Sequence, residues 1–215
     1  MSLFQKSVLN KYLNEQDKNA VSEAFEKYST YFFNPVIQQN INVSKEEQFQ
    51  EGFLRELFVN VFGYVLNPHP DFNLTTELKN EKGAKKADGA ILKDGKAIAV
   101  IELKSTKTKD LESIRQQAFD YKANQSECVY VITSNFQKIR FYVNNAVEFE
   151  EFDLFTLSED RFQVLLLCLS SENLLSDLPL KIKNASLLEE ENITKKFYAD
   201  YSLFKKELFE SIATK

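Results

Sequence analysis

The sequence predicts a mixed α/β fold: a β-sheet flanked by helices, followed by a helical C-terminal appendage. Helical spacing before residue 63 gives way to three strand-like segments, a helix and further strands. Residues 97–103 read Ala-Ile-Ala-Val-Ile-Glu-Leu, which is typical of a central strand buried on both faces. Nineteen Phe and nine Tyr supply core-forming side chains, whereas five Gly and four Pro are too few for a loop-rich β-sandwich or a disordered chain.

The N-terminal part of the chain is predicted to be helical. Residues 1–33 have loose helical spacing, and Asn34-Pro35 ends this region because the residue before proline disfavours helical dihedrals. Ser44 is the expected cap of a stronger helix, and Glu47 completes a capping box. Gly63 supplies its C-terminal stop.

A β-rich region follows a loop at residues 67–70. The Asp94-Gly95 pair is a strong signal for a hairpin turn between the second and third strands. The expected strands are 72–78, 87–92, 97–103, 128–133, 139–143 and 148–152, and the expected helices are 110–123, 159–175 and 187–213.

The stretch from Leu178 to Ser186 is the predicted linker. We therefore divide the chain into an N-terminal helical segment (1–44), an α/β core (45–180) and a helical connector (181–215).

Composition limits the partners that the chain can bind. A formal net charge of -5 argues against a generic polyanion binder, so contact with DNA would need a local basic patch. Lysines do cluster around the segment 87–103, although such clusters are usually solvated surface. They are Lys79, Lys82, Lys85, Lys86, Lys104, Lys107 and Lys109.

The remaining composition points to the cytoplasm. Cys128 and Cys168 form no C-x-x-C pair and are interpreted as buried thiols in a reducing compartment. No secretory signal is visible at the N-terminus, and the longest apolar run, residues 164–169, is too short to span a bilayer. His69, the single histidine, lies between two prolines and is interpreted as a loop residue.

Two acids and one amine are predicted to meet at one end of the sheet. Asp88 begins one strand, and Glu102 and Lys104 end the next strand across the hairpin. Residues two apart in a strand share a face, so Glu102 and Lys104 point the same way. Hairpin pairing brings the Asp88 end of the first strand beside them.

This set of groups suits metal-dependent phosphodiester hydrolysis. Carboxylates are hard oxygen ligands for Mg²⁺, which activates water, and positive charge stabilises the transition state. We expect Asp88, Glu102 and the backbone carbonyl of Leu103 to bind Mg²⁺, for which Mn²⁺ can substitute. Lys104 would position the attacking water. The alternative from the same residues is an ordinary salt bridge at a strand end.

A third acid is expected from the helix that ends at Gly63. At about 100° per residue, Glu51 falls near the apolar stripe of this helix, whereas Glu56 falls nearly opposite it. Glu51 is therefore a candidate metal ligand. It is equally well explained as a first-turn glutamate favoured by the helix dipole.

The pattern of these residues resembles the PD-(D/E)xK nuclease superfamily. Asp88 is followed at a distance of 14 residues by Glu102-Leu103-Lys104, and Ala87 stands where the classical motif has proline. Gln117 and Tyr121 match the Q-x-x-x-Y element that RecB-like members carry on the next helix.

The likeness extends to the N-terminal nuclease region of type IIG restriction–modification proteins and covers roughly residues 45–145. It includes Gly63-Tyr64, the Lys-Lys-Ala-Asp-Gly run at residues 85–89 and Ser134-Asn135-Phe136. The segment 193–201 is similar to the connector that leads into an adenine methyltransferase in those proteins.

The resemblance implies a restriction-endonuclease-like fold that cuts double-stranded DNA. Gln117 and Tyr121 would support the site or contact the DNA backbone, and Lys85, Lys86 and Lys107 would contact phosphates. Methyltransferase and target-recognition domains, in the same or a partner chain, are the implied partners.

Two other functions remain open from the sequence. One is a non-catalytic module of the same fold that binds DNA or docks a partner domain, which the negative net charge favours. The other is an RNA or nucleotide hydrolase, because the ligand set alone does not define the substrate.

Overall fold

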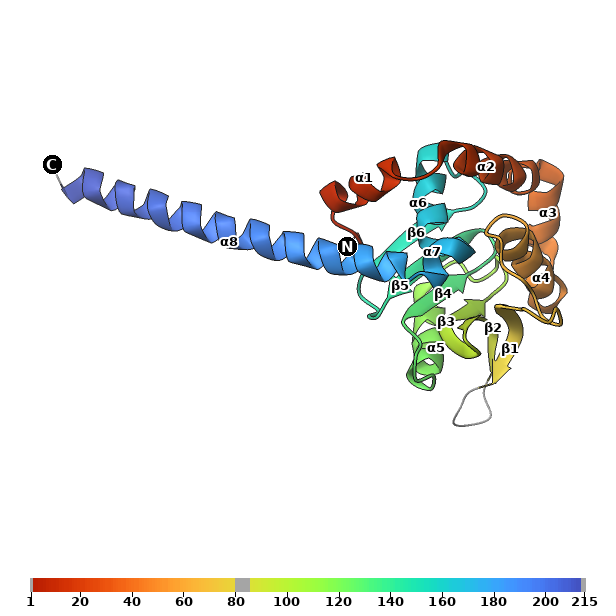
Figure 1. Ribbon diagram of the computed structural model, residues 1–215. Helices are drawn as coiled ribbons and strands as arrows, with labels where there is room; N and C mark the ends of the chain where they lie inside the picture. Colours follow the sequence, from red (N-terminus) through yellow and green to blue (C-terminus); the bar gives the residue numbers. More distant parts are fainter. Residues whose placement is uncertain (1, 80–85, 214–215) are drawn as a thin grey trace.

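The computed structural model describes residues 2–79 and 86–213, which form a six-stranded sheet with helices on both faces (Figure 1). The strands are β1 (Leu74–Lys79), β2 (Lys86–Lys93), β3 (Lys96–Leu103), β4 (Tyr130–Ser134), β5 (Lys138–Val143) and β6 (Phe149–Asp153). The helices of the N-terminal half are α1 (Lys6–Asn14), α2 (Lys18–Phe32), α3 (Pro35–Val43), α4 (Glu46–Phe53) and η1 (Leu54–Val59). Those that follow are α5 (Glu112–Ala123), α6 (Glu159–Leu169), α7 (Ser171–Leu175) and α8 (Leu178–Ala213).

The strands lie in the sheet in chain order, and the sheet is mixed. β1, β2 and β3 pair antiparallel, β3 pairs parallel with β4, and β4, β5 and β6 again pair antiparallel. The single parallel pair needs a crossover connection, which α5 supplies. The mixed α/β class is confirmed, and so are all six expected strands.

The hairpin between β2 and β3 turns at the predicted residues. Asp94 and Gly95 have φ angles of 51° and 77°. Positive φ at both central residues is the requirement of a type I′ turn, which Asp-Gly satisfies at little cost. This turn fixes the register in which β2 and β3 present their side chains.

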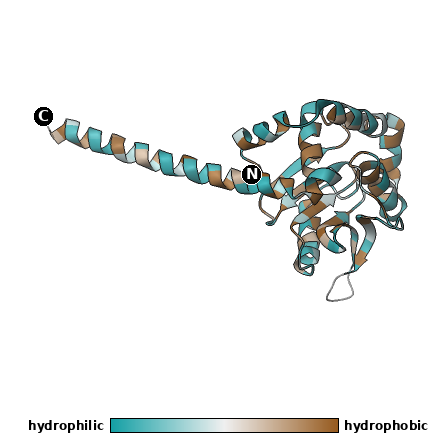
Figure 2. Cartoon of the chain, viewed as in Figure 1, coloured by the Kyte–Doolittle hydropathy of each residue, from teal (hydrophilic) through white to brown (hydrophobic). Residues whose placement is uncertain are grey.

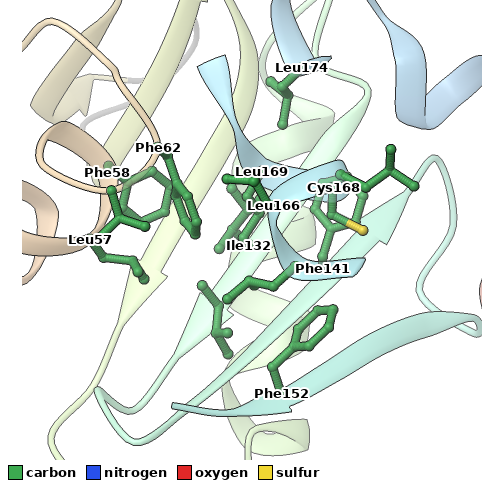
Figure 3. Close-up of a cluster of buried hydrophobic side chains, with 14 of the residues drawn as sticks. Leu57, Phe58, Phe62, Ile132, Phe141, Phe152, Leu166, Cys168, Leu169 and Leu174 are labelled. Carbon is green, nitrogen blue, oxygen red and sulfur yellow. The ribbon is translucent and has the colours of Figure 1, made fainter. Parts of the chain in front are cut away.

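The main core lies on the sheet face that η1 and α6 cover. Figure 3 shows Leu57 and Phe58 from η1 and Leu166 and Leu169 from α6 facing Ile132 of the sheet. The opposite face is covered by α5, whose Ala118 and Tyr121 pack with Val100 and Val131 in a smaller cluster. The two cysteines are free and buried, as expected.

The predicted end of the first helical region at Asn34-Pro35 is confirmed, because α2 ends at Phe32, but the predicted cap at Ser44 was wrong. Asn34-Pro35 also begins a helix, because the Asn34 side chain accepts hydrogen bonds from the Val36 and Ile37 amides and Pro35 occupies the first turn of α3. Ser44 ends α3 and does not cap the next helix. The N-cap of α4 is Lys45, whose amide donates to the Gln48 side chain at 2.9 Å.

The predicted linker at residues 178–186 is also wrong, because this stretch is the first part of α8. Ile182 is fully buried, and Lys183 and Ser186 are 4% and 1% exposed. Lys183 Nζ lies 2.6 Å from a Glu148 carboxylate oxygen and ties the helix to the residue just before β6. The second part of α8 extends away from the body (Figure 1). Within the described residues, no helix is both long enough and apolar enough to cross a membrane.

Candidate functional site

Asp88 and Glu102 lie at the same end of the β2–β3 hairpin, as the sequence predicted. Gly89 pairs with Ile101 across the two strands, and the two acids are the next residue outward on each strand. Asp88 is fixed by the backbone of the neighbouring strand, because its Oδ2 accepts the Leu103 amide at 2.8 Å.

Gly89 permits the main core to approach the strand next to Asp88. A Cβ at this position would come within 3.3 Å of a Leu54 methyl carbon of η1. Leu54 of η1 therefore packs directly against the backbone of Gly89, the residue next to Asp88.

Lys104 is the centre of the cluster. Its ammonium lies 2.8 Å from Glu102 Oε1, 3.2 Å from Glu46 Oε1 and 4.0 Å from Asp88 Oδ2. It also donates to the carbonyl of Leu103 at 2.9 Å. One cation thus contacts three acids at the end of β3.

Glu102 is the buried member of the cluster, with 1% of its side chain exposed. Its Oε1 accepts from Lys104 and also from Gln117 Nε2 of α5 at 2.7 Å. The same Gln117 nitrogen lies 3.1 Å from the Tyr121 hydroxyl. The structure therefore brings Gln117 to the acids, while the Tyr121 hydroxyl contacts Gln117 and the Tyr121 side chain packs on the sheet.

Glu46 reaches the cluster because aromatic packing positions α4. The Phe49 and Phe53 rings lie 5.1 Å and 5.3 Å from the ring of Phe136. Phe136 follows β4 with φ of 68° and is fully buried. Packing on this ring directs the first turn of α4, where Glu46 lies, toward the end of β3.

Glu51, the predicted third acid, does not reach the cluster. Its side chain is 68% exposed and pairs with Arg55 at 2.8 Å. The prediction used one helical period from residue 62 back to residue 51. Residues 54–59 form a π-helix, whose wider turns change the direction of every side chain before them. Glu46 is the helix acid that contacts Lys104.

The two strand acids, Asp88 and Glu102, differ in how their surroundings shift their pKa values. Burial raises the pKa of Glu102 to about 7, outweighing the hydrogen bond from Lys104. Burial also raises the pKa of Asp88, but the Leu103 amide and the Lys104 charge oppose it. Burial lowers the pKa of Lys104, yet its bond to Glu102 and the nearby acids raise it overall. At neutral pH Lys104 is therefore an ammonium, and Glu102 is the group that titrates.

One carboxylate oxygen of the cluster has no partner. Glu102 Oε2 is buried and accepts no hydrogen bond from the residues that the structure describes. Such an oxygen costs free energy unless a ligand or water satisfies it. Lys104 is shared among the three acids, so ionisation of Glu102 adds a negative charge that this one ammonium must divide with Glu46 and Asp88.

This donor set fits a hard divalent cation. Mg²⁺ is commonly held by one or two carboxylates, with water and substrate phosphate completing its ligands. Asp88, Glu102 and the Leu103 carbonyl are such donors. Residues 2–79 and 86–213 contain no group of three or more His, Cys, Asp or Glu side chains arranged to hold a metal ion. A site here would therefore rest on two carboxylates.

The predicted basic residues are less well placed. Lys86 pairs with Glu77 at 2.9 Å on the surface, and Lys107 is exposed in the segment after β3. Lys85 lies outside the described residues. His69 lies in an exposed turn, where its Nδ1 accepts the Asp71 amide, which agrees with a loop role.

Sequence reasoning missed Glu46 and Gln50. The Gln50 side chain hydrogen-bonds Asp88 and lowers its pKa, although burial dominates the overall shift. Residues 46 and 50 are one helical turn apart, so they share a face. This shared face points to the site only once the π-helical turns of residues 54–59 are known.

Comparison with known proteins gives one distant likeness. A solved structure described as a cryo-EM structure of a DrdV–DNA complex aligns with a TM-score of 0.41 and 14% sequence identity. The alignment covers 69% of this chain and only 13% of that chain. A likeness at this level does not establish a shared activity. No protein-family model and no curated protein matches the chain.

Proposed function

We propose that the chain is a Mg²⁺-dependent endodeoxyribonuclease domain of the PD-(D/E)xK type, working in a restriction–modification system. The observation that carries this proposal is the Glu102 carboxylate, which is buried and has one unpartnered oxygen beside Asp88 and Lys104. A purely structural salt bridge would be expected to satisfy both oxygens of its buried acid.

In this proposal Asp88, Glu102 and the Leu103 carbonyl hold the metal ion. When bound, Mg²⁺ supplies a Lewis acid that lowers the pKa of water and offsets charge on the phosphate. The Leu103 carbonyl now accepts from Lys104, so the ammonium would leave this oxygen when a cation arrives. Its contacts with Glu46 and Asp88 keep it at the same end of the sheet.

Lys104 holds its proton and would act through its charge. An ammonium beside the scissile phosphate positions water and stabilises the negative charge that develops in the transition state. Gln117 would orient Glu102 through its 2.7 Å hydrogen bond. Glu46 would hold Lys104 in place, a role that the sequence had assigned to no residue.

Double-stranded DNA is the proposed substrate, and its binding needs help from other domains. The net charge of -5 opposes contact with a polyanion. Lys86, Lys107 and Lys85 could contact phosphates, which would position DNA without reading its sequence. Methyltransferase and target-recognition domains remain the proposed partners, and the cytoplasm the proposed location.

Cleavage of a duplex substrate tests the proposal directly. The chain should cut DNA with Mg²⁺ or Mn²⁺ and not with a chelator. Asp88→Asn, Glu102→Gln and Lys104→Ala should each lower the rate by about 100-fold or more, because the first two remove metal ligands and the third removes the positive charge beside the reacting phosphate. Glu47→Gln is the control and should leave the rate unchanged, since Glu47 is exposed in the helical turn that holds Glu46.

Measuring metal binding tests the proposal without DNA, which matters if the isolated chain binds DNA weakly. Calorimetry should detect Mn²⁺ binding to the wild type, weakened strongly in Glu102→Gln and unchanged in Glu47→Gln. Equal cutting in chelator, or equal cutting by Lys104→Ala and wild type, would remove the nuclease proposal.

A non-catalytic docking or DNA-binding module is the second candidate. The observation that favours it is Lys104, which already neutralises part of the acid cluster and occupies the Leu103 carbonyl. This candidate predicts a folded wild type that binds no Mn²⁺ and cuts no DNA under any metal condition.

A further inference from the structure

The outer part of α8, residues 187–213, exposes an unusual amount of apolar surface. Of the sixteen exposed large hydrophobic side chains in the described residues, eleven lie in this segment. A helix in water normally buries such groups against a partner. They are Leu187, Leu188, Ile193, Phe197, Tyr198, Tyr201, Leu203, Phe204, Leu208, Phe209 and Ile212. Brown bands recur along the projecting helix in Figure 2.

These side chains include a regular stripe. Phe197, Tyr201, Phe204 and Leu208 are spaced by four, three and four residues, which is the spacing of a coiled-coil seam. The Phe197 and Tyr201 rings stack at 6.4 Å along this seam. The spacing indicates that the partner packed against this stripe is a single helix.

The stripe continues the face by which α8 packs on its own domain. At about 100° per residue, Ile182 and Ser186 fall within roughly 60° of Phe197. Both are buried in the body, whereas Phe197 is 64% exposed. The same face of α8 is therefore buried against the body up to Ser186 and exposed to solvent beyond it.

We infer that the stripe pairs with the same stripe of a second copy of this chain, in antiparallel orientation. Each domain body covers the stripe face of its own helix up to Ser186. In a parallel pair both bodies would need the same space beside that face. In an antiparallel pair each body lies past the far end of the other helix, and the two exposed segments overlap along about 40 Å.

Charges on α8 agree with this orientation. Glu190 falls on the seam, so parallel helices would bring the two Glu190 side chains together, whereas antiparallel helices separate them. A pairing that sets Phe197 against Tyr201 of the second copy also sets Glu191 against its Lys205. Glu191 now pairs with Lys195 at 3.6 Å, an exposed contact of little energy that it can exchange.

The area that the stripe can bury is that of a weak pair. Leu188, Leu203 and Phe209 lie roughly 120° or more from the seam, so the other eight of the eleven side chains would be covered. If each of the eight lost roughly 50 Å² of exposed surface, two copies would bury about 800 Å² in total. This is below the range of stable interfaces, so we expect dissociation at tens to hundreds of micromolar.

Sedimentation of the full chain at several concentrations tests this inference, independently of any nuclease activity. The wild type should be a monomer–dimer mixture, and Phe204→Glu should be a monomer at every concentration. Leu203→Glu is the matched control: residue 203 is equally exposed but lies roughly 120° from the seam, so dimerisation should persist. A monomeric wild type, including one that binds lipid vesicles or another protein as a monomer, overturns the inference.

A charge exchange tests the orientation. Lys205→Glu should weaken the dimer by roughly tenfold, because two Glu191–Lys205 pairs become repulsive. Adding Glu191→Lys should restore it. In a parallel pair Lys205 would face Asp200, so the second change would not restore binding, and that result would overturn the antiparallel arrangement.

Disulfide trapping provides a second orientation test. The Thr194→Cys/Phe204→Cys variant should form a cross-linked dimer, because these positions face each other between antiparallel copies. Each single variant should cross-link poorly. Cross-linking of the single variants with failure of the double variant would contradict the inference; Cys128 and Cys168 do not interfere because both are buried.

Discussion

Glu102→Gln is expected to change how the stability of the metal-free protein depends on pH. Glu102 is 1% exposed, and burial raises its pKa to about 7 from a usual value of 4.5. Between these two pH values the folded state keeps a proton that the unfolded state has lost. The unfolding free energy therefore falls as pH rises from 4.5 to 7, and it is level above that range.

The size of this effect follows from the shift in pKa. At about 1.4 kcal/mol per pH unit, ionised Glu102 costs the fold roughly 3 kcal/mol in total, of which 2 to 3 kcal/mol develops between pH 5 and 8. Glutamine has the same shape and does not titrate. Its amide adds a cost that is the same at every pH.

Urea unfolding at pH 5, 6, 7 and 8 with a chelator present measures the effect. The unfolding free energy of Glu102→Gln minus that of the wild type should grow by roughly 2 to 3 kcal/mol across this range. Glu47→Gln, which alters an exposed acid, should show no such trend. Parallel pH curves for Glu102→Gln and wild type would refute the reasoning, because they would mean that Glu102 is not held in a site that disfavours its charge.

Three further predictions concern contacts outside the candidate site, each measured by denaturant unfolding. Lys183→Ala should cost about 3 kcal/mol or more, because it leaves Glu148 half-enclosed without its partner, and a change under 1 kcal/mol would contradict a buried pair. Tyr28→Phe should cost about 1 kcal/mol by removing the hydroxyl that donates to the Leu154 carbonyl, and an unaltered midpoint would mean that this bond adds nothing. Gly63→Ala should cost about 1 kcal/mol, since the φ of Gly63 is 78° and L-residues avoid that region; a stabilised variant would disprove the backbone argument.

The sheet and the strand acids could be predicted from sequence because their signals are local. The Asp94-Gly95 turn defines the hairpin, and strand alternation then places Glu102 and Lys104 on one face. Asp88 follows from pairing across that turn. None of these inferences depends on contacts between distant elements.

The helix contribution to the site could not be predicted in the same way. Which acid reaches Lys104 depends on where α4 begins and on the π-helical turns that follow it. It also depends on Phe136, which follows β4, lies more than 80 residues later in the chain and contacts α4 only in the folded protein. The wider π-helical turns rotate every side chain before them, and this exchanges Glu51 for Glu46 as the acid that faces Lys104.

The start of α8 was missed for a related reason. Pro179 was interpreted as the mark of a linker, but it is the second residue of the helix. In the first turn a proline costs nothing, because the amide it lacks would have no partner there. Proline therefore predicts a boundary without saying on which side of it the helix lies.

Because α8 runs without a break from Leu178 to Ala213, its length and helical phase fix where its distal residues lie and which way they face relative to the sheet. An extra residue inserted after Ser186 would turn everything beyond it by about 100° around the axis and advance it by about 1.5 Å, while seven extra residues would nearly recover the original direction. A partner bound to the distal half of α8 is therefore held at a fixed orientation and distance relative to the sheet, which a flexible linker would not provide. The effect of insertions after Ser186 on function should therefore vary with the number of inserted residues and repeat about every seven residues, whereas a flexible linker would show no such repeat.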